Sequence, residues 1–317
     1  MPTATNDGLS LSYEIDGPAD GEPVVLVQGL GTGRWMWRRQ REALADEYRV
    51  VLPDNRGTGR SDAPDGPYTI PQMAADLEAV LADAGIDRAH VVGASMGGMI
   101  AQRYAVEYDR AAGLGLLCTT HGGPDAVPVP EETRAEMFAE PEDADERERI
   151  KRRMRPSVSD SLYEDRPALV EWIVDRRLEQ NADDAAREAQ AAGVMAFDAS
   201  DELEELELPT LVLHGDADRV VPVENARLLD EGLPESRLEL LEGGHHLFFV
   251  EEAEWVNDRL AAFLQTNPLD GAVEGGGADD TRENVVAGDA REDVESGGAG
   301  DARENVDAAA ENPVSDA

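Results

Sequence analysis

Short apolar runs alternate with longer amphipathic stretches through most of this sequence. The runs, rich in valine and leucine, lie at residues 24–27, 49–52, 90–93, 114–118, 210–214 and 238–241. Because they contain few alternating polar positions, they are typical of strands buried on both faces of a parallel sheet. Between them, residues 73–84 and 251–264 repeat apolar side chains at helical spacing. This strand–helix–strand rhythm predicts a doubly wound α/β fold with a mostly parallel sheet.

The rhythm is interrupted between residues 124 and 207, where no strand pattern is found. That stretch is charged and helical in character, and prolines divide it at positions 128, 130, 141, 156 and 167. We therefore expect a helical cap at 124–207, inserted into an α/β core made of residues 7–123 and 208–267.

Composition changes again near Pro268. From Asp270 to Ala317 the chain holds 14 acidic residues, three arginines and no aromatic residue. Such a segment cannot bury enough apolar surface to offset its ordering entropy. We expect residues 268–317 to form a disordered acidic tail, a solvated extension rather than a partner-binding segment.

The net charge of the chain disfavours two classes of binding partner. The chain of 317 residues has 68 acidic and 28 basic residues, a net charge of −40. Nucleic acid and anionic membranes bind through basic residues that neutralise phosphate, so neither is expected as a partner. Only one basic residue is a lysine, Lys151. A large acidic excess with almost no lysine is typical of proteins from extreme halophiles, in which molar salt screens self-repulsion.

The sequence also limits where the protein is expected to work. Cys118 is the single cysteine, which excludes an intramolecular disulfide and a cysteine zinc cluster. The N-terminal segment lacks the pattern of a secretory leader, and no apolar run approaches the roughly 20 residues that cross a bilayer. We expect a cytoplasmic protein.

A candidate nucleophile, Ser95, lies in the sequence Gly-Ala-Ser-Met-Gly at residues 93–97. It follows one apolar run and precedes a helical pattern at 99–108. In a nucleophile elbow, a sharp strand-to-helix turn exposes the serine hydroxyl, and small neighbours give the turn clearance. The motif alone is weak, because a tight glycine turn with an inert serine has the same sequence.

Candidate partners of Ser95 follow two later apolar runs. Asp216 and Asp218 come after the run at 210–214, and His245 and His246 come after the run at 238–241. A serine hydroxyl becomes nucleophilic when an imidazole removes its proton, and a buried carboxylate fixes the tautomer of that imidazole. The chain order serine, aspartate, histidine agrees with a nucleophile elbow.

With these motifs, residues 7–267 resemble the α/β-hydrolase superfamily, in particular its capped esterases, enol-lactonases and cofactor-free haloperoxidase-like hydrolases. The segment Asp-Asn-Arg-Gly-Thr-Gly-Arg-Ser at 54–61 is similar to the family's Asp-x-Arg-Gly-x-Gly-x-Ser loop. The segment at 214–222 is similar to its His-Gly-x-x-Asp-x-x-x-Pro motif, which implies that Asp218 rather than Asp216 is the acid.

The resemblance also bears on the base. In the family the catalytic histidine usually stands five residues before a glutamate that begins the last helix. Counting back from Glu251 gives His246, and His245 fills a position more often held by glycine. The resemblance therefore implies His246 as the base, with His245 as the alternative.

An oxyanion hole of two backbone amides is implied in the same way. One amide belongs to Met96, the residue after Ser95, and the other to Leu30 in the glycine-rich loop at 28–33. The family usually has His-Gly in this loop, whereas this chain has Gln28 before the glycine. The spacing of the loop's glycines does not match a dinucleotide loop, and no phosphate loop or metal spacing is found. No cofactor and no metal are expected.

The other residues that could carry chemistry have ordinary interpretations. His90 and His214 are expected to be structural residues at strand ends, and Cys118 a buried small side chain. Two sets of residues are open between a pocket wall and plain packing: His121 with Trp35 and Trp37, and the insertion's Phe138, Trp172 and Phe197.

We therefore expect a serine hydrolase that cleaves a small carboxylic ester or lactone through an acyl-enzyme on Ser95. The same triad could serve perhydrolysis, hydroxynitrile lysis or C–C hydrolysis, since the fold supports many chemistries. A non-catalytic ligand-binding protein on the same fold is the third alternative. The expected partner is a small molecule, and the sequence predicts no oligomeric state.

Overall fold

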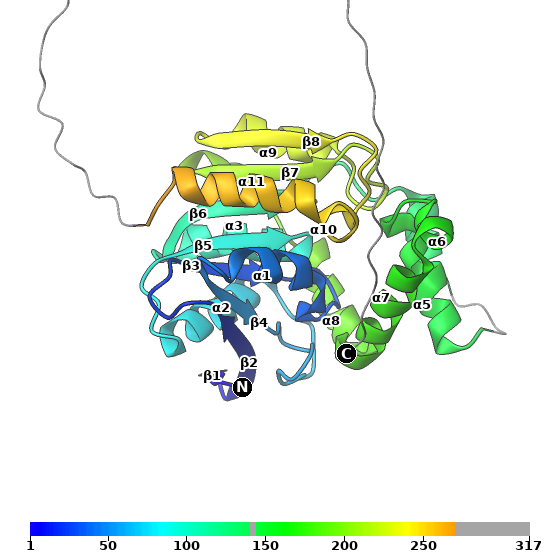
Figure 1. Cartoon of the computed structure of the whole chain (residues 1–317), viewed down its shortest axis with the longest axis horizontal. Coiled ribbons are helices and arrows are strands. Elements are labelled where there is room, and N and C mark those ends of the chain that lie inside the picture. Colours follow the sequence, from blue (N-terminus) through cyan, green and yellow to red (C-terminus); the bar gives the residue numbers. More distant parts are fainter. Residues whose placement is uncertain (140–143, 270–317) are drawn as a thin grey trace, which may run out of the picture. The chain divides into compact units, whose positions relative to one another are not determined.

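A sheet of eight strands forms the centre of the fold, in the order β1-β2-β4-β3-β5-β6-β7-β8 (Figure 1). The structure is a computed structural model and describes residues 1–139 and 144–269. The strands are β1 (Thr3–Asn6), β2 (Leu9–Asp16), β3 (Pro23–Val27), β4 (Arg49–Pro53), β5 (Ala89–Ala94), β6 (Ala111–Leu117), β7 (Thr210–Gly215) and β8 (Ser236–Leu241).

Strands β3 to β8 are parallel to one another, and β1 and β2 form an antiparallel edge. The predicted mostly parallel α/β sheet is therefore confirmed. Unbroken apolar runs do not predict the two edge strands, because β2 reads Leu-Ser-Leu-Ser-Tyr. Such alternation is typical of an antiparallel strand with unlike faces. β1 precedes residue 7, the predicted start of the core, and pairs with β2 at the edge of the sheet.

Helices cover both faces of the sheet, as a doubly wound fold requires. The alternation of strand side chains shows this in β3. Val25 and Val27 pack into one buried cluster with helices α2 (Ile70–Asp83) and α3 (Met96–Glu107). Val24 and Leu26 pack into another cluster with α11 (Ala253–Thr266). Figure 1 shows α1, α10 and α11 on one face. The core helices are α1 (Arg38–Leu44), α2 (Ile70–Asp83), α3 (Met96–Glu107), α9 (Glu224–Gly232), α10 (Phe248–Glu251) and α11 (Ala253–Thr266).

Local sequence explains where these helices start. Thr69 caps α2 by accepting a hydrogen bond from the Gln72 backbone, and the Gln72 side chain accepts one from the Thr69 backbone. With a proline in the first turn, this capping box begins the helix at Ile70, three residues before the predicted start. The predicted helix at 251–264 corresponds to α11, which begins at Ala253 after the short α10.

In the described part of the chain between β6 and β7, five helices lie beyond the carboxyl ends of the strands (Figure 1). They are α4 (Glu131–Met137), α5 (Glu146–Met154), α6 (Leu162–Asp165), α7 (Pro167–Gln180) and α8 (Asp184–Met195). Short 3₁₀ turns at Arg155–Ser157 and Ser200–Glu205 belong to the same stretch, and a further one at Arg34–Trp37 precedes α1. Prolines stand at the start of two of these helices: Pro130 precedes α4 and Pro167 is the first residue of α7. Buried residues of this insertion, including Met154, Leu162 and Ile173, join the cluster around α11.

From residue 270 onward, the predicted acidic tail at 268–317 lies outside the described residues. Among the helices that are described, none is both long and apolar enough to cross a membrane.

Candidate active site

Ser95 occupies the sharp turn between β5 and α3. Its backbone has φ 54° and ψ −120°, a conformation that costs a non-glycine residue about 1–3 kcal/mol. Glycines on either side make the turn possible: a Cβ on Gly93 would lie 2.1 Å from the Gly97 oxygen, and one on Gly97 would lie 2.1 Å from the Val27 oxygen. The Gly-x-Ser-x-Gly sequence is therefore required by close backbone approach on both sides of the serine.

Asp218 and His246 meet although 28 positions separate them in the sequence. The Nδ1 atom of His246 lies 2.7 Å from Oδ2 of Asp218. The other carboxylate oxygen, Oδ1, accepts hydrogen bonds from the backbone amides of Val220 at 2.7 Å and Val221 at 3.0 Å. Because the amides hold one oxygen and the imidazole meets the other, the carboxylate has a fixed orientation.

The electrostatic balance at Asp218 favours its charged form. Burial raises the pKa of this carboxyl group, but the charge of His246 and hydrogen bonds from His214 and His246 outweigh burial and lower the pKa below its ordinary value. His214 was expected to be structural, and it is fully buried with Nε2 2.8 Å from the Val221 oxygen and 3.3 Å from Oδ2 of Asp218. Its contact with the carboxylate is a feature that sequence reasoning missed.

The alternative acid and base lie elsewhere. Asp216 accepts a hydrogen bond from the Gly243 amide at 2.6 Å, at an exposed position. His245 is half-buried, and its Nδ1 lies 3.1 Å from the Gly243 oxygen. Both residues thus hold the surface loop, whereas Asp218 and His246 contact each other inside the fold.

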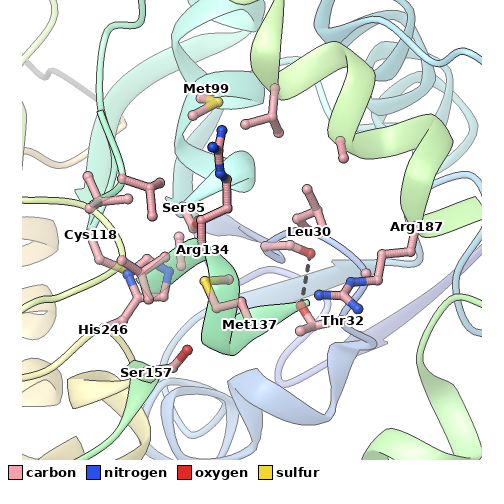
Figure 2. A pocket seen from close by; sticks show the side chains of 18 of the residues that line it. Leu30, Thr32, Ser95, Met99, Cys118, Arg134, Met137, Ser157, Arg187 and His246 are labelled. Carbon is pink, nitrogen blue, oxygen red and sulfur yellow. Dashed lines mark hydrogen bonds between the residues drawn. The ribbon is translucent and has the colours of Figure 1, made fainter. Parts of the chain in front are cut away.

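A cavity of about 490 Å³ opens beside Ser95 and His246 (Figure 2). The loop after β3 contributes Gly29, Leu30 and Thr32 to its wall. Apolar side chains from the core and from the insertion complete much of the lining, among them Met99, Cys118, Met137, Phe138, Val194 and Phe197. The structure therefore places the predicted nucleophile and base on one pocket beneath the insertion.

The two amides predicted as oxyanion donors belong to the loop after β3 and to the start of α3. Leu30 lines the cavity, and Met96 is the first residue of α3. In the part of the chain that the structure describes, neither amide donates a hydrogen bond. Gln28, which replaces the usual histidine, is fully buried, and its Nε2 donates to the Pro53 oxygen at 2.7 Å. It thereby ties the end of β3 to the end of β4.

Helix α8 is joined by hydrogen bonds to the loop that carries Leu30. Oε1 of Gln190 accepts a hydrogen bond from the Gly31 amide at 2.7 Å, and its Nε2 donates to the Arg56 oxygen at 2.8 Å. The Ala182 amide donates to the Gly31 oxygen at 3.1 Å. No sequence motif indicates these contacts, because they join residues more than 130 positions apart. The loop's geometry therefore depends on the insertion.

A second contact joins the insertion to the loop of His246. The Leu247 amide donates to the Ser157 oxygen at 2.8 Å. Glu251, predicted only as a marker for His246, is buried and accepts hydrogen bonds from the amide and hydroxyl of Ser159 at 3.0 and 2.5 Å. The histidine loop is thus fixed on its far side as well.

The remaining candidates separate into lining and packing residues. Phe138, Phe197 and Cys118 line the cavity, and burial raises the pKa of the Cys118 thiol well above its usual value. Trp35 and Trp172 pack edge to face at a centroid distance of 5.9 Å and line a different hollow. Trp37 is fully buried against Phe249. Within residues 1–139 and 144–269, no group of three His, Cys, Asp or Glu side chains could hold a metal ion.

Comparison with known proteins identifies the fold family. A family model described as alpha/beta hydrolase fold matches residues 22–253. A candidate carbamate hydrolase, RutD, of Azorhizobium caulinodans is 31% identical over 277 residues, which cover 83% of this chain and 98% of that protein.

Solved structures give the same result. The enol-lactonase of Burkholderia xenovorans LB400 has a TM-score of 0.72 at 27% identity, over 83% of this chain and 100% of that one. Est816, described as an N-acyl homoserine lactone degrading enzyme, has a TM-score of 0.70 at 29% identity, with the same coverage. The chain therefore belongs to the α/β-hydrolase fold family.

Proposed function

We propose that this protein is a serine hydrolase that cleaves small carboxylic esters or lactones through an acyl-enzyme on Ser95. The observation that carries the proposal is the 2.7 Å contact between His246 and the buried Asp218, together with a cavity that both His246 and the strained Ser95 line. Orientation of an imidazole by a buried carboxylate, beside a serine that lines the same cavity, is the arrangement that activates a hydroxyl.

The proposed reaction begins when Oγ of Ser95 attacks the carbonyl carbon of the substrate. Nε2 of His246 takes the serine proton, and Asp218 holds the proton on Nδ1 and stabilises the imidazolium that forms. The amides of Leu30 and Met96 donate to the developing oxyanion. His246 then returns the proton to the leaving oxygen, and water, activated by the same imidazole, releases the acyl group.

The cavity supports a small substrate. Its volume of about 490 Å³ lies toward the lower part of the range of about 300–1,000 Å³ typical of small-molecule sites. Among the similar proteins, one is an enol-lactonase and another is described as degrading N-acyl homoserine lactones. These names favour the bond between a carbonyl carbon and an ester oxygen as the target. When a lactone is opened, the leaving oxygen remains attached to the acyl group through the opened chain.

The test is hydrolysis of 4-nitrophenyl acetate, 4-nitrophenyl butyrate and a small lactone in concentrated KCl, with wild type compared with Ser95→Ala. We expect kcat to fall by about 10⁴-fold or more in the variant, because the nucleophile is removed. Ser10→Ala, on the edge strand β2 and outside the cavity lining, is the matched control and should keep wild-type rates.

Full activity in folded Ser95→Ala would contradict the proposal. Product analysis separates hydrolysis from perhydrolysis, lyase and C–C bond cleavage, because only hydrolysis of the ester yields the free acid and alcohol from water alone. Stoichiometric ligand binding without turnover by the folded wild type would favour a non-catalytic binding protein instead.

A further inference from the structure

The cavity beside Ser95 has a basic wall in a strongly acidic chain. Two acidic side chains line it, Glu146 and Asp184, and both are exposed. Four basic side chains also line it, and all come from the insertion: Arg134, Arg153, Arg177 and Arg187. Since the whole chain carries a net charge of −40, this lining reverses the sign of the charge locally. A charged wall in a cleft of low dielectric constant concentrates ligands of opposite sign.

Arg177 and Arg187 differ from most arginines of this protein. Arg34, Arg56 and Arg103, for example, each lie 2.6 Å from a carboxylate oxygen. Among the described residues, no hydrogen bond or ion pair engages the guanidinium group of Arg177 or Arg187, and Nε of Arg177 is buried without a partner. In a chain with so many acids, two unpaired guanidinium groups on one cavity require an explanation.

Aromatic rings support the two guanidinium groups. That of Arg177 lies 5.8 Å from the ring centroid of Trp35, and that of Arg187 lies 5.0 Å from the ring centroid of Phe138. Contact with a ring face leaves the N–H groups at the edge of the guanidinium plane available to an acceptor. Both groups are therefore held in place while their hydrogen-bonding capacity is unused.

The surroundings also disfavour the two positive charges. Burial lowers the pKa of Arg177 to about 10, and the charge of Arg187 adds to this effect. Burial lowers the pKa of Arg187 too, with a contribution from the charge of Arg153. A bound anion would compensate both the lost solvation and the mutual repulsion of these groups.

Arg187 extends along the loop that carries the predicted oxyanion donor. A Cβ added to Gly31 would lie 3.4 Å from Cγ of Arg187, so the side chain packs directly on this glycine. Figure 2 shows Arg187 near Thr32, on the side of the pocket opposite His246. A group held there lies across the cavity from the imidazole.

We propose that Arg177 and Arg187 bind a carboxylate at the end of the substrate remote from the bond that is cleaved. The enzyme then prefers esters or lactones that carry a negative charge over neutral ones. This inference rests on the proposed function, because it assigns one end of the substrate of that same site. Guanidinium groups bind carboxylates through paired, charge-assisted hydrogen bonds, which gives both attraction and orientation.

The test compares two esters that differ in one charge: the monoanionic 4-nitrophenyl hydrogen adipate and its neutral methyl ester, methyl 4-nitrophenyl adipate. Release of 4-nitrophenol reports cleavage of the same bond in both, at one fixed KCl concentration. We expect wild type to have the higher kcat/KM for the anion. In Arg187→Gln and in Arg177→Gln, the ratio of kcat/KM for the anion to that for the neutral ester should fall by about 10- to 100-fold.

Two further variants control this result. Arg176→Gln removes a neighbouring charge of α7 that pairs with Glu179 at 2.7 Å and does not line the cavity, so the ratio should stay at the wild-type value. Arg187→Lys keeps the charge without the planar fork and should give an intermediate ratio. A wild-type preference for the neutral ester, or a ratio unchanged in both glutamine variants, would overturn the proposal.

A binding experiment separates this inference from the proposed function. Calorimetry measures binding of monomethyl adipate, an anion, and dimethyl adipate, which is neutral, to Ser95→Ala. We expect Ser95→Ala to bind the anion more tightly than the neutral diester, even if wild type cleaves neither 4-nitrophenyl ester. The double variant that combines Ser95→Ala with Arg187→Gln should lose this difference in affinity. Equal affinity for both ligands would overturn the carboxylate subsite, whatever the outcome of the hydrolysis assays.

Discussion

At the scale of single residues, Asp218 is the best-defined group of the candidate site. Its Oδ1 accepts two backbone amides and its Oδ2 faces His246. In Asp218→Asn, the amides of Val220 and Val221 require the remaining oxygen, so the NH₂ group would face His246. The imidazole would then carry its proton on Nε2 and be unable to accept one from Ser95.

We therefore expect Asp218→Asn to lower kcat by about 10³- to 10⁴-fold with little change in stability. Steady-state ester hydrolysis and thermal unfolding measure the two effects. Asp216→Asn, which alters only an exposed loop contact, should stay within about threefold of wild type. Similar losses in both variants would show that Asp218 has no special role.

His90, a buried histidine away from the candidate active site, should make the stability of the fold depend on pH. The side chain is fully buried beside Phe263, and burial lowers its pKa from 6.5 to about 4. Between pH 6.5 and about 4 the unfolded chain binds a proton at this residue that the folded chain does not, so stability falls with falling pH.

At pH 5 the loss due to His90 should be about 2 kcal/mol relative to pH 7. Denaturant unfolding of wild type and His90→Gln at both values measures it, because the glutamine variant retains every other titrating group. The wild type should lose more free energy of unfolding than the variant. Parallel pH dependence would show that the His90 imidazole is protonated in the folded state.

At the scale of elements, α8 and the loop after β3 behave as one unit. Gln190 is fully buried and connects the Gly31 amide to the Arg56 carbonyl. In Gln190→Ala both backbone groups lose their partner, which should lower the free energy of unfolding by about 1–3 kcal/mol. Because the Leu30 amide lies in the same loop, we also expect kcat to fall by about tenfold while KM changes less.

Glu188→Ala is the control for this prediction, since it removes an exposed side chain of the same helix. Thermal unfolding and steady-state kinetics on a neutral ester measure the two effects. A loss of stability in Gln190→Ala with unchanged kcat would mean that the helix supports the fold but does not position the loop of Leu30 for the reaction.

Sequence patterns were informative where the cause is local. The apolar runs identified the six parallel strands, and the glycines around Ser95 indicated the elbow because their spacing reflects a backbone constraint. The positions of Asp218 and His246 came from a family resemblance. The strands β1 and β2 were missed because their alternating pattern is weak over a few residues.

Contacts between distant segments left no such pattern. The hydrogen bonds of Gln190, the approach of His214 to Asp218 and the unpaired state of Arg187 depend on how the insertion and the core pack. A single polar residue in a helix has the same local sequence whether it faces solvent or a loop. These features therefore required the structure.

At the scale of the whole molecule, the dominant quantity is the net charge of −40. Repulsion among surface carboxylates opposes the compact state, and molar salt shortens the Debye length to about 3 Å. We expect the free energy of unfolding to rise by on the order of 2–4 kcal/mol between 0.1 and about 2 M KCl. Urea unfolding at each salt concentration measures this change.

Sucrose at matched osmolality controls for the exclusion of cosolutes from the protein surface, which stabilises proteins without screening charge. It should stabilise the fold less than KCl does. Equal stability in low and high KCl would contradict the salt adaptation that the composition predicts, and it would leave the assignment of the active site unaffected.

The acyl-enzyme on Ser95 is tested most directly by covalent trapping. Intact-mass spectrometry after reaction with a fluorophosphonate, followed by peptide mapping, shows which residue is modified and at what stoichiometry. We predict one adduct per chain on Ser95, none in Ser95→Ala, and slow labelling in His246→Ala, because the imidazole activates the hydroxyl. An adduct on a different residue, or none in folded wild type that turns over esters, would contradict the account.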